Sequence, residues 1–232
     1  FLADELYEKS GKIKLVYFRN SIVFIFILLS GNLSHAETRE QHALDAVQEN
    51  YEKVLTYEAE FIQKSYIKMM DKTQEVKGTV SIKKPGKMKW SYGAPDTQIL
   101  ISNGNTLWLY VPDEEQATKV PIESIYSSNT PALFLAGKGK LAQSFNVERV
   151  NLDKDPLIIT LTPKADDQSL TRLKLFANKK NYQITGSTVY DKLGNKTEIR
   201  FSNIKTNREI PEKTFQFQAP VNVEVLDYTK PH

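Results

Sequence analysis

Residues 76–110 read VKGTVSIKKPGKMKWSYGAPDTQILISNGNTLWLY, and this stretch decides the fold class. Apolar and polar residues alternate through it, and the alternation is interrupted at Pro85-Gly86 and at Asn103-Gly104. A period of two is typical of strands with one dry face and one wet face, as in antiparallel sheets. Pro-Gly and Asn-Gly pairs favour tight turns. The stretch therefore predicts consecutive antiparallel hairpins.

The same alternation continues on both sides of this stretch. Before it, residues 57–67 alternate in the same way, from Tyr57 and Phe61 onward. A long series of amphipathic strands with little helix tends to curl toward a barrel, so we expect a curved sheet. Further strands are predicted near residues 117–120, 145–150, 157–162, 170–177, 183–190 and 197–204. A last strand is suggested by Phe215 and Phe217, with Val221, Val223 and Val225 as its continuation.

Two segments have helical patterns instead. Thr38 and Gln41 have the spacing of a capping box, and Leu44, Val47 and Tyr51 then recur on one helical face. The second segment, residues 130–137, begins with Thr-Pro and ends with Gly, which is typical of a short helix. These helices either cover an apolar cavity as a lid or complete a filled core, and the pattern by itself leaves both open.

Residues 1–36 are predicted to be a secretory signal peptide. Basic residues precede an eight-residue apolar run, IVFIFILL at positions 22–29, and Ser34-His35-Ala36 offers small residues at the cleavage spacing. The run is too short for a transmembrane helix, which needs roughly 20 apolar residues. We therefore expect one exported domain over residues 37–232.

Composition excludes several classes of function. The chain has 31 basic and 28 acidic residues, and this balance argues against a nucleic-acid partner. It has three His and no Cys, so a His-based triad, a thiol nucleophile and a multi-ligand metal site are not expected. We predict a binding protein rather than an enzyme, without a cofactor or a metal.

An ordered series of motifs resembles a known family, the periplasmic outer-membrane lipoprotein carrier of the LolA type. The matches keep their order and spacing from about residue 57 to residue 220, and together they cover nearly the whole predicted domain. They are Phe61-Ile62-Gln63, KKPGKMKW at 83–90, Pro95, ILISNGNTLWLY at 99–110, EQAT at 115–118, Asn129-Thr130-Pro131 and LTPKA at 161–165.

The resemblance implies a mainly β fold, an open antiparallel half-barrel with α-helices as a lid over an apolar cavity. It also implies that the protein takes acylated lipoproteins from an inner-membrane ABC-type releasing complex and delivers them to an outer-membrane lipoprotein receptor. No chemistry and no cofactor are implied, and we expect a monomer. The receptor of the same fold is anchored through an N-terminal Cys, so the absence of Cys favours the carrier.

The candidate site residues follow from the pattern and the resemblance together. In the family, the position before the Pro of the Lys-Arg-Pro pattern is an Arg that latches the lid, and here it is Lys84, which offers one point of charge instead of a planar fork. We expect Lys84 to latch the helix at 130–137, although a solvated lysine is the alternative. The predicted cavity and lid residues, each of which could equally be plain core, are Leu44, Val47, Tyr51, Phe61, Val80, Met88, Trp90, Tyr92, Leu133 and Phe134.

One alternative function stays open at this point. A half-barrel of this kind could also serve as an envelope sensor module that binds lipids or glycolipids, because the same apolar cavity suits both roles.

Overall fold

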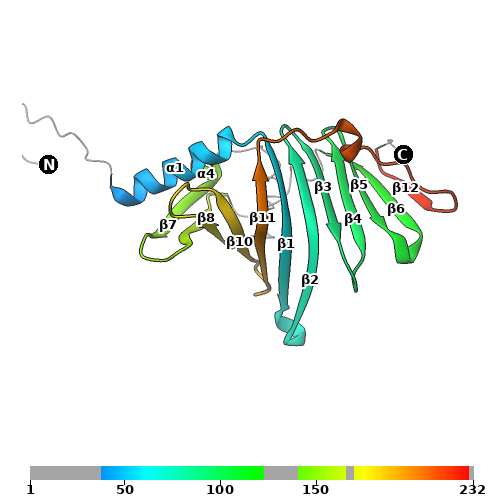
Figure 1. The fold of residues 1–232 in the computed structure, drawn as a ribbon. Helices are drawn as coiled ribbons and strands as arrows, with labels where there is room; N and C mark the ends of the chain where they lie inside the picture. The colour runs from blue at the N-terminus through cyan, green and yellow to red at the C-terminus, as the bar shows by residue number, and fades with distance from the viewer. Residues whose placement is uncertain (1–37, 123–140, 166–169, 230–232) are drawn as a thin grey trace, which may run out of the picture. The chain divides into compact units, whose positions relative to one another are not determined.

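The computed structural model describes residues 38–122, 141–165 and 170–229. Twelve strands in this part of the chain form one sheet, in the order β12-β6-β5-β4-β3-β2-β1-β11-β10-β9-β8-β7, and Figure 1 shows the strands side by side with α1 at one end of them. Every neighbouring pair is antiparallel except β12 and β6, which run parallel. The sheet is open, with β12 and β7 as its edges, so the predicted fold class is confirmed.

The elements have the following bounds. The helices are α1 (Arg39–Lys53) and the short α4 (Leu141–Ser144), and short 3-10 turns lie at Lys68–Met70, Pro112–Glu114 and Glu212–Phe215. The strands are β1 (Thr56–Ile67), β2 (Lys72–Lys83), β3 (Lys87–Tyr92), β4 (Gln98–Asn103), β5 (Thr106–Val111), β6 (Gln116–Pro121), β7 (Phe145–Asn151), β8 (Leu157–Pro163), β9 (Arg172–Ala177), β10 (Ile184–Tyr190), β11 (Lys196–Thr206) and β12 (Glu224–Asp227).

Helix α1 begins where the capping pattern predicted. The Thr38 hydroxyl accepts a hydrogen bond from the backbone N–H of Gln41 at 3.1 Å. The reciprocal half of the capping box is not formed, because the Gln41 side chain donates to Asp45 at 3.0 Å instead. The predicted apolar face is buried, with Leu44 and Val47 among its members. One cap bond is therefore enough to start this helix when its apolar face packs against the sheet.

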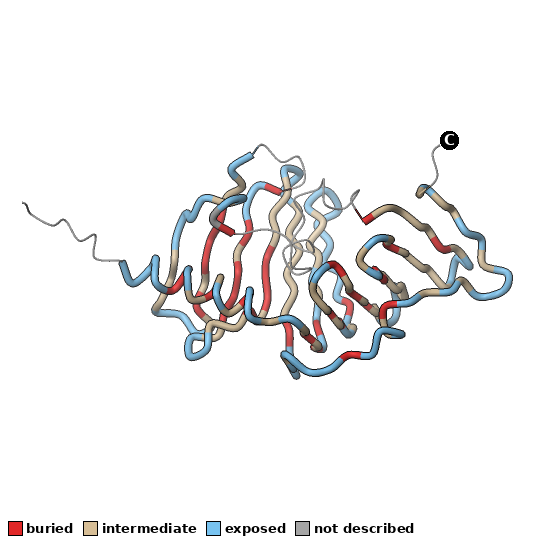
Figure 2. The backbone as a smooth tube through the Cα atoms, turned by 90° about the horizontal axis from the view of Figure 1, so that it is seen from above, coloured by how far each residue is buried: buried red, intermediate tan, exposed pale blue. Residues whose placement is uncertain are grey.

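The buried side chains form two clusters, and Figure 2 shows buried segments in both halves of the sheet. In the first cluster, the apolar face of α1 packs with residues from β8, β9 and β10. In the second, residues of β1, β2, β3, β5 and β11 pack with Ile122. Strand β1 pairs with β2 on one side and with β11 on the other, so it joins the two halves of the sheet.

The chain end departs from the predicted last strand. Phe215 closes a 3-10 turn and Phe217 lies in irregular structure, whereas the last strand is β12, which pairs with β6. The Phe217 ring lies 5.2 Å from the Trp108 ring and 5.4 Å from the Tyr110 ring. The prediction was wrong at Phe215 and Phe217, because two apolar residues at spacing two also suit a segment that packs across a sheet without joining it. Of its predicted continuation, Val225 does lie in β12.

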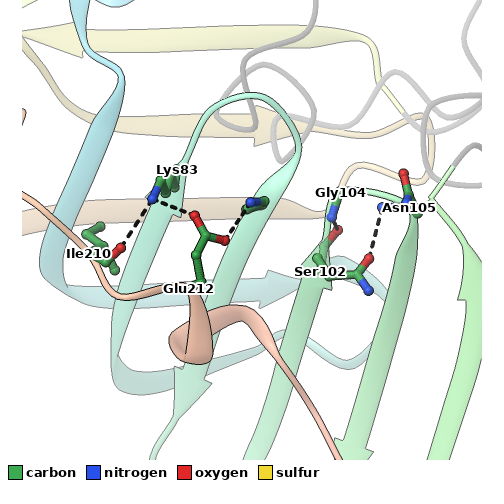
Figure 3. Close-up of polar contacts among 8 residues, drawn as sticks. Lys83, Ser102, Gly104, Asn105, Ile210 and Glu212 are labelled. Atoms are coloured by element: carbon green, nitrogen blue, oxygen red, sulfur yellow. Dashed lines mark hydrogen bonds and ion pairs between the residues drawn. The ribbon is translucent and has the colours of Figure 1, made fainter.

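A carboxylate holds this C-terminal segment to the β2–β3 hairpin (Figure 3). Glu212 accepts from Lys83 and from Lys87, each at 2.6 Å, and Lys83 also donates to the backbone carbonyl of Ile210 at 3.4 Å. In the neighbouring β4–β5 turn, the Ser102 hydroxyl accepts from the Gly104 N–H at 3.1 Å. The hydrogen bonds with Lys83 and Lys87 lower the pKa of Glu212 to about 2.

Candidate functional site

One face of strands β1 to β6 is apolar over most of its length, and we call it the apolar face. Alternate residues of a strand point to the same side, and paired residues of neighbouring strands share that side. Ala59 pairs with Val80, Val80 pairs with Trp90, and Trp90 pairs with Leu100. The next row along the strands contains Phe61, which pairs with Phe201 of β11. The strand register therefore places side chains from five strands on one continuous surface.

Aromatic rings form the middle of the apolar face. The centre of the Phe61 ring lies 5.1 Å from both the Trp90 and the Tyr92 rings, and both contacts are edge-on. Trp90 lies 6.1 Å from Phe201, and Tyr57 lies 5.5 Å from the same Phe201 ring. Such aromatic pairs add stability beyond the burial of their area. They also form a closely packed apolar wall, which suits an apolar ligand.

A glycine makes room for this aromatic group. Gly78 pairs with Phe61 on one side and with Tyr92 on the other. A Cβ atom built on Gly78 lies 2.6 Å from Phe61 Cζ and 2.2 Å from the carbonyl oxygen of Ser91. Any side chain at position 78 therefore displaces the ring or the strand, and the glycine lets Phe61 lie flat across β2.

The predicted site residues fall into two groups in the structure. Phe61, Val80, Met88 and Trp90 are buried together in the second cluster, and the partly buried Tyr92 packs against them. The face of α1, with Leu44, Val47 and Tyr51, belongs to the first cluster, on strands β8 to β10. The predicted lid residues Leu133 and Phe134 lie outside the described residues. Among the described residues, α1 and the aromatic group thus cover different halves of the sheet.

Lys84 follows β2 directly and is bound to the end of α1. Its ammonium group donates a hydrogen bond to the backbone carbonyl of Tyr51, and it lies 3.5 Å from the centre of the Tyr51 ring. The predicted partner, the helix at 130–137, lies outside the described residues. The carbonyl groups of a last helical turn lack partners within the helix and carry partial negative charge, so a cation here is favourable.

Burial changes the titration of the polar groups around this contact. Loss of water lowers the pKa of Lys84 from 10.5 to about 8, although the nearby Glu52 carboxylate acts in the opposite direction. Burial also raises the pKa of Tyr57 and of Tyr92, so both phenols stay neutral at physiological pH. The Tyr57 hydroxyl donates to the carbonyl of Ile184 at 3.4 Å. The two phenols therefore add no charge to the apolar face.

A small pocket marks the place where α1, β1 and β2 meet. Its volume is about 30 Å³, and Tyr51, Val54, Tyr57, Ile82 and Lys84 are among the residues that line it. A pocket of this volume has room for roughly two water molecules. An acyl chain does not fit there unless the end of α1 moves away from the sheet. The Lys84–Tyr51 contact lies at the wall of this pocket and opposes that movement.

Sequence reasoning missed several residues of the second cluster. Ala59, Ile82 and Leu107 are buried there with Phe201 and Ile122. Ala59 and Ile82 stand on the predicted strands at the same alternating positions as Phe61 and Val80, so the period of two could have identified them. Phe201 could not have been identified in this way, because only the pairing of β11 with β1 brings it to this face.

The described residues contain neither a metal-ligand cluster nor a membrane-spanning helix. Within residues 38–122, 141–165 and 170–229, no cluster of three or more His, Cys, Asp or Glu side chains is placed to hold a metal ion. In the same ranges, no helix combines the length and the apolarity needed to cross a bilayer.

Comparison with known proteins places the chain among lipoprotein carriers. The family model described as "Outer membrane lipoprotein carrier protein LolA" matches residues 52–218. An outer-membrane lipoprotein carrier protein of Hahella chejuensis is 34% identical over 186 residues, which is 79% of this chain and 87% of the relative. One from Chromohalobacter salexigens is 33% identical over 176 residues, 75% of this chain and 82% of the relative.

The fold is similar to that of solved structures. The crystal structure of an uncharacterized conserved protein from Thermus thermophilus matches with a TM-score of 0.52 and 13% identity, over 81% of this chain and 98% of that one. At this level of identity the likeness concerns the arrangement of the strands and not their use.

Proposed function

The chain belongs to the LolA family of outer-membrane lipoprotein carrier proteins, and from this premise we propose that it binds the acyl chains of lipoproteins and carries them through the periplasm. The cargo would come from an inner-membrane ABC-type releasing complex and go to an outer-membrane receptor. The carrier would act as a chaperone and run no reaction. Residues 1–36 would direct its export as a signal peptide.

The observation that carries this proposal is the apolar face. Phe61, Val80, Met88 and Trp90 are side by side on one surface, each with at most 3% of its area exposed. A buried apolar wall in a sheet with open edges is suited to an apolar ligand. The element that covers the wall must then be able to move. Met88 adds a pliable part to this wall, since Met side chains adapt to irregular ligands.

The energetics explain why a movable cover is needed. Burial of an acyl chain is worth roughly 0.8 kcal/mol per methylene, so a chain of a dozen methylenes gains on the order of 10 kcal/mol. A rigid and perfectly fitted cavity would not release such a cargo. A carrier works if opening the empty protein costs part of this gain. In this proposal Leu133 and Phe134 cover the apolar face, and the end of α1 at Tyr51 closes the pocket beside it. The cargo displaces both.

Lys84 is proposed as the latch of this cover. Its contact with Tyr51 holds the end of α1 against the β2–β3 hairpin. Because a lysine offers one point of charge where an arginine offers a fork, the latch opens more easily than an arginine latch would. The variant Lys84→Leu should change the rate at which bound lipoprotein is transferred to membranes. Transfer at the wild-type rate would show that Lys84 is not a latch.

A release assay tests the proposed function. Mature protein, residues 37–232, is mixed with inner membranes that carry an acylated lipoprotein, or the same cargo without its acylated Cys. We expect a soluble complex with the acylated cargo alone. If neither cargo is released and free lipids or glycolipids co-purify instead, the protein is a lipid-binding sensor module and not a lipoprotein carrier.

A further inference from the structure

The face that carries the aromatic group becomes polar along the strands. On β1, Tyr57, Ala59 and Phe61 are buried, and the next residues on the same side are Gln63 and Ser65. On β2 the same change occurs in the opposite chain direction, because Gln63 pairs with Val76 and Ser65 pairs with Gln74. On both strands the face therefore changes from apolar near α1 to polar at the opposite end.

A depression lies on this polar end. Its volume is about 540 Å³, and it is lined by Gln63, Ser65 and Gln74 together with residues of the β3–β4 and β5–β6 turns. The Gln63 side chain donates to the Ser65 hydroxyl at 3.2 Å, so this part of the surface offers amide and hydroxyl groups. Val76 and Gln98 also line the depression, and Gln98 pairs with Tyr92. The depression is thus continuous with the aromatic part of the face.

The rim of the depression is acidic. Asp96 stands on the β3–β4 turn, and Asp113 and Glu114 stand on the β5–β6 turn. The described residues that line the depression include these three carboxylates and no basic side chain. All three are exposed, so their electrostatic effect on a ligand weakens as the salt concentration rises.

We propose that the depression lined by Gln63, Ser65 and Gln74 binds the polar part of an acylated protein, the glyceryl esters and the first peptide groups next to the acyl chains. The proposal rests on the proposed function and deepens it, because it gives the cargo one orientation. The acyl chains lie toward Trp90 and α1, and the protein part of the cargo leaves at the acidic end, where basic or neutral residues next to the acylated position are favoured.

The chemistry of the ligand is the reason for this orientation. An ester or amide group that is buried without a hydrogen-bond partner costs free energy, because it loses its hydrogen bonds to water. Amide and hydroxyl side chains offer several such partners, whereas the Phe61 and Phe201 rings in the aromatic part of the face offer none. An acylated peptide that lay the other way round would press its polar groups on Phe61 and Trp90 and leave its acyl chains against Gln74.

Site-directed labelling tests the orientation, because the chain has no Cys of its own. The variants Ser65→Cys and Thr118→Cys each exchange a small, partly exposed hydroxyl residue for a thiol. Ser65 lies at the polar end, and Thr118 pairs with Leu109 in the row of Leu100 and Trp90. The probe is a diacylglyceryl peptide with a bromoacetyl group on its second residue. Reaction with iodoacetamide corrects for the accessibility of each thiol.

We expect the peptide-linked group to modify Ser65→Cys on the order of tenfold faster than Thr118→Cys, since a bound reagent acts at high effective concentration. A probe with the bromo group at the acyl end should show the reverse preference. Equal or opposite preferences would overturn the orientation while binding stays intact. If the probe fails to displace a fluorescent fatty acid from the wild-type protein, the proposed function fails together with the orientation.

The acidic rim has its own test. Lipopeptides with Lys or Glu at the second residue are compared on the wild type and on the triple variant Asp96→Asn, Asp113→Asn, Glu114→Gln. The wild type should bind the Lys peptide several-fold more tightly at low salt, and the triple variant should show no preference. A preference that survives in the triple variant would overturn the assigned role of the rim.

Discussion

The ammonium group of Lys84 lies 3.5 Å from the centre of the Tyr51 ring and donates a hydrogen bond to the Tyr51 carbonyl. The Lys84 side chain thereby contacts both the ring and the backbone of Tyr51, a residue in the last turn of α1. The next helix-end carbonyls have partners too, since Val54 N–H donates to Asn50 and the Asn207 side chain donates to the Lys53 carbonyl at 3.3 Å. The end of α1 is therefore attached to the sheet by polar contacts.

The first prediction concerns this attachment. In Lys84→Met, the backbone amide of Val54 should exchange its hydrogen faster, by roughly tenfold, because a hydrogen bond to a charged donor that is half-buried is worth about 1 kcal/mol or more. Lys84→Arg, which restores a charged donor and offers a planar fork, should exchange no faster than the wild type. Hydrogen–deuterium exchange with mass spectrometry measures both. Exchange at the wild-type rate in Lys84→Met would mean that the contact does not hold the end of α1.

The pH dependence of stability has a definite sign at Lys84. Burial lowers its pKa to about 8 from 10.5, so between these pH values the unfolded chain binds more protons than the folded one. The free energy of unfolding should therefore rise with pH from about 8 to about 10.5, relative to Lys84→Met. Because the side chain is half-buried, we expect on the order of 1 kcal/mol after screening by solvent. Denaturant titrations of both proteins across this pH range measure the difference in their free energies of unfolding. If that difference does not change with pH, the prediction is wrong.

Glu212 should affect stability at acidic pH. Its pKa is lowered to about 2 by the hydrogen bonds with Lys83 and Lys87, so its stabilising effect is present above the usual pKa near 4.5 and is lost as the pH falls toward 2. The melting temperature of the wild type should therefore approach that of Glu212→Gln on acidification. The effect is small because Glu212 is exposed. Glu209→Gln, an exposed carboxylate for which no such contact is found in the described residues, is the matched control.

Gly78 should tolerate no side chain. In Gly78→Ala, the new methyl group meets the Ser91 carbonyl oxygen and the Phe61 ring, and we expect a loss of about 1–3 kcal/mol in the free energy of unfolding. Gly93→Ala is the control, because a Cβ there has one close neighbour, the Lys77 carbonyl oxygen at 3.3 Å. Chemical denaturation compares the two. Equal losses in both variants would contradict the close packing of Phe61 on β2.

The two tryptophans should report on ligand binding separately. Trp90 lies on the apolar face, whereas Trp108 pairs with Ile101 and packs against Phe217 on the other side of the sheet. Lipopeptides with brominated acyl chains should quench the fluorescence of Trp108→Phe, which retains Trp90, much more than that of Trp90→Phe. Stronger quenching in Trp90→Phe would place the acyl chains on the side of the sheet that carries Trp108, which would contradict the proposed site.

The sequence determined the strands and their faces. The alternation through residues 76–110 and the turn at Asn103-Gly104 correspond to β2 through β5, and Phe61, Met88 and Trp90 are buried as their positions in the alternation indicate. These features are local, because a period of two and a turn type depend on neighbouring residues. The same local rules failed at Phe217, which packs on Trp108 without entering a strand.

Only the tertiary structure decided which faces meet. The pairing of β1 with β11 brings Phe201 to Tyr57 and Trp90, although about 110 or more residues separate these positions in the chain. The division into two clusters, the contact of Lys84 with Tyr51 and the polar depression beside Gln74 likewise depend on strand order and register. Periodicity assigns each residue to a face of its own strand, whereas long-range pairing determines what that face contacts.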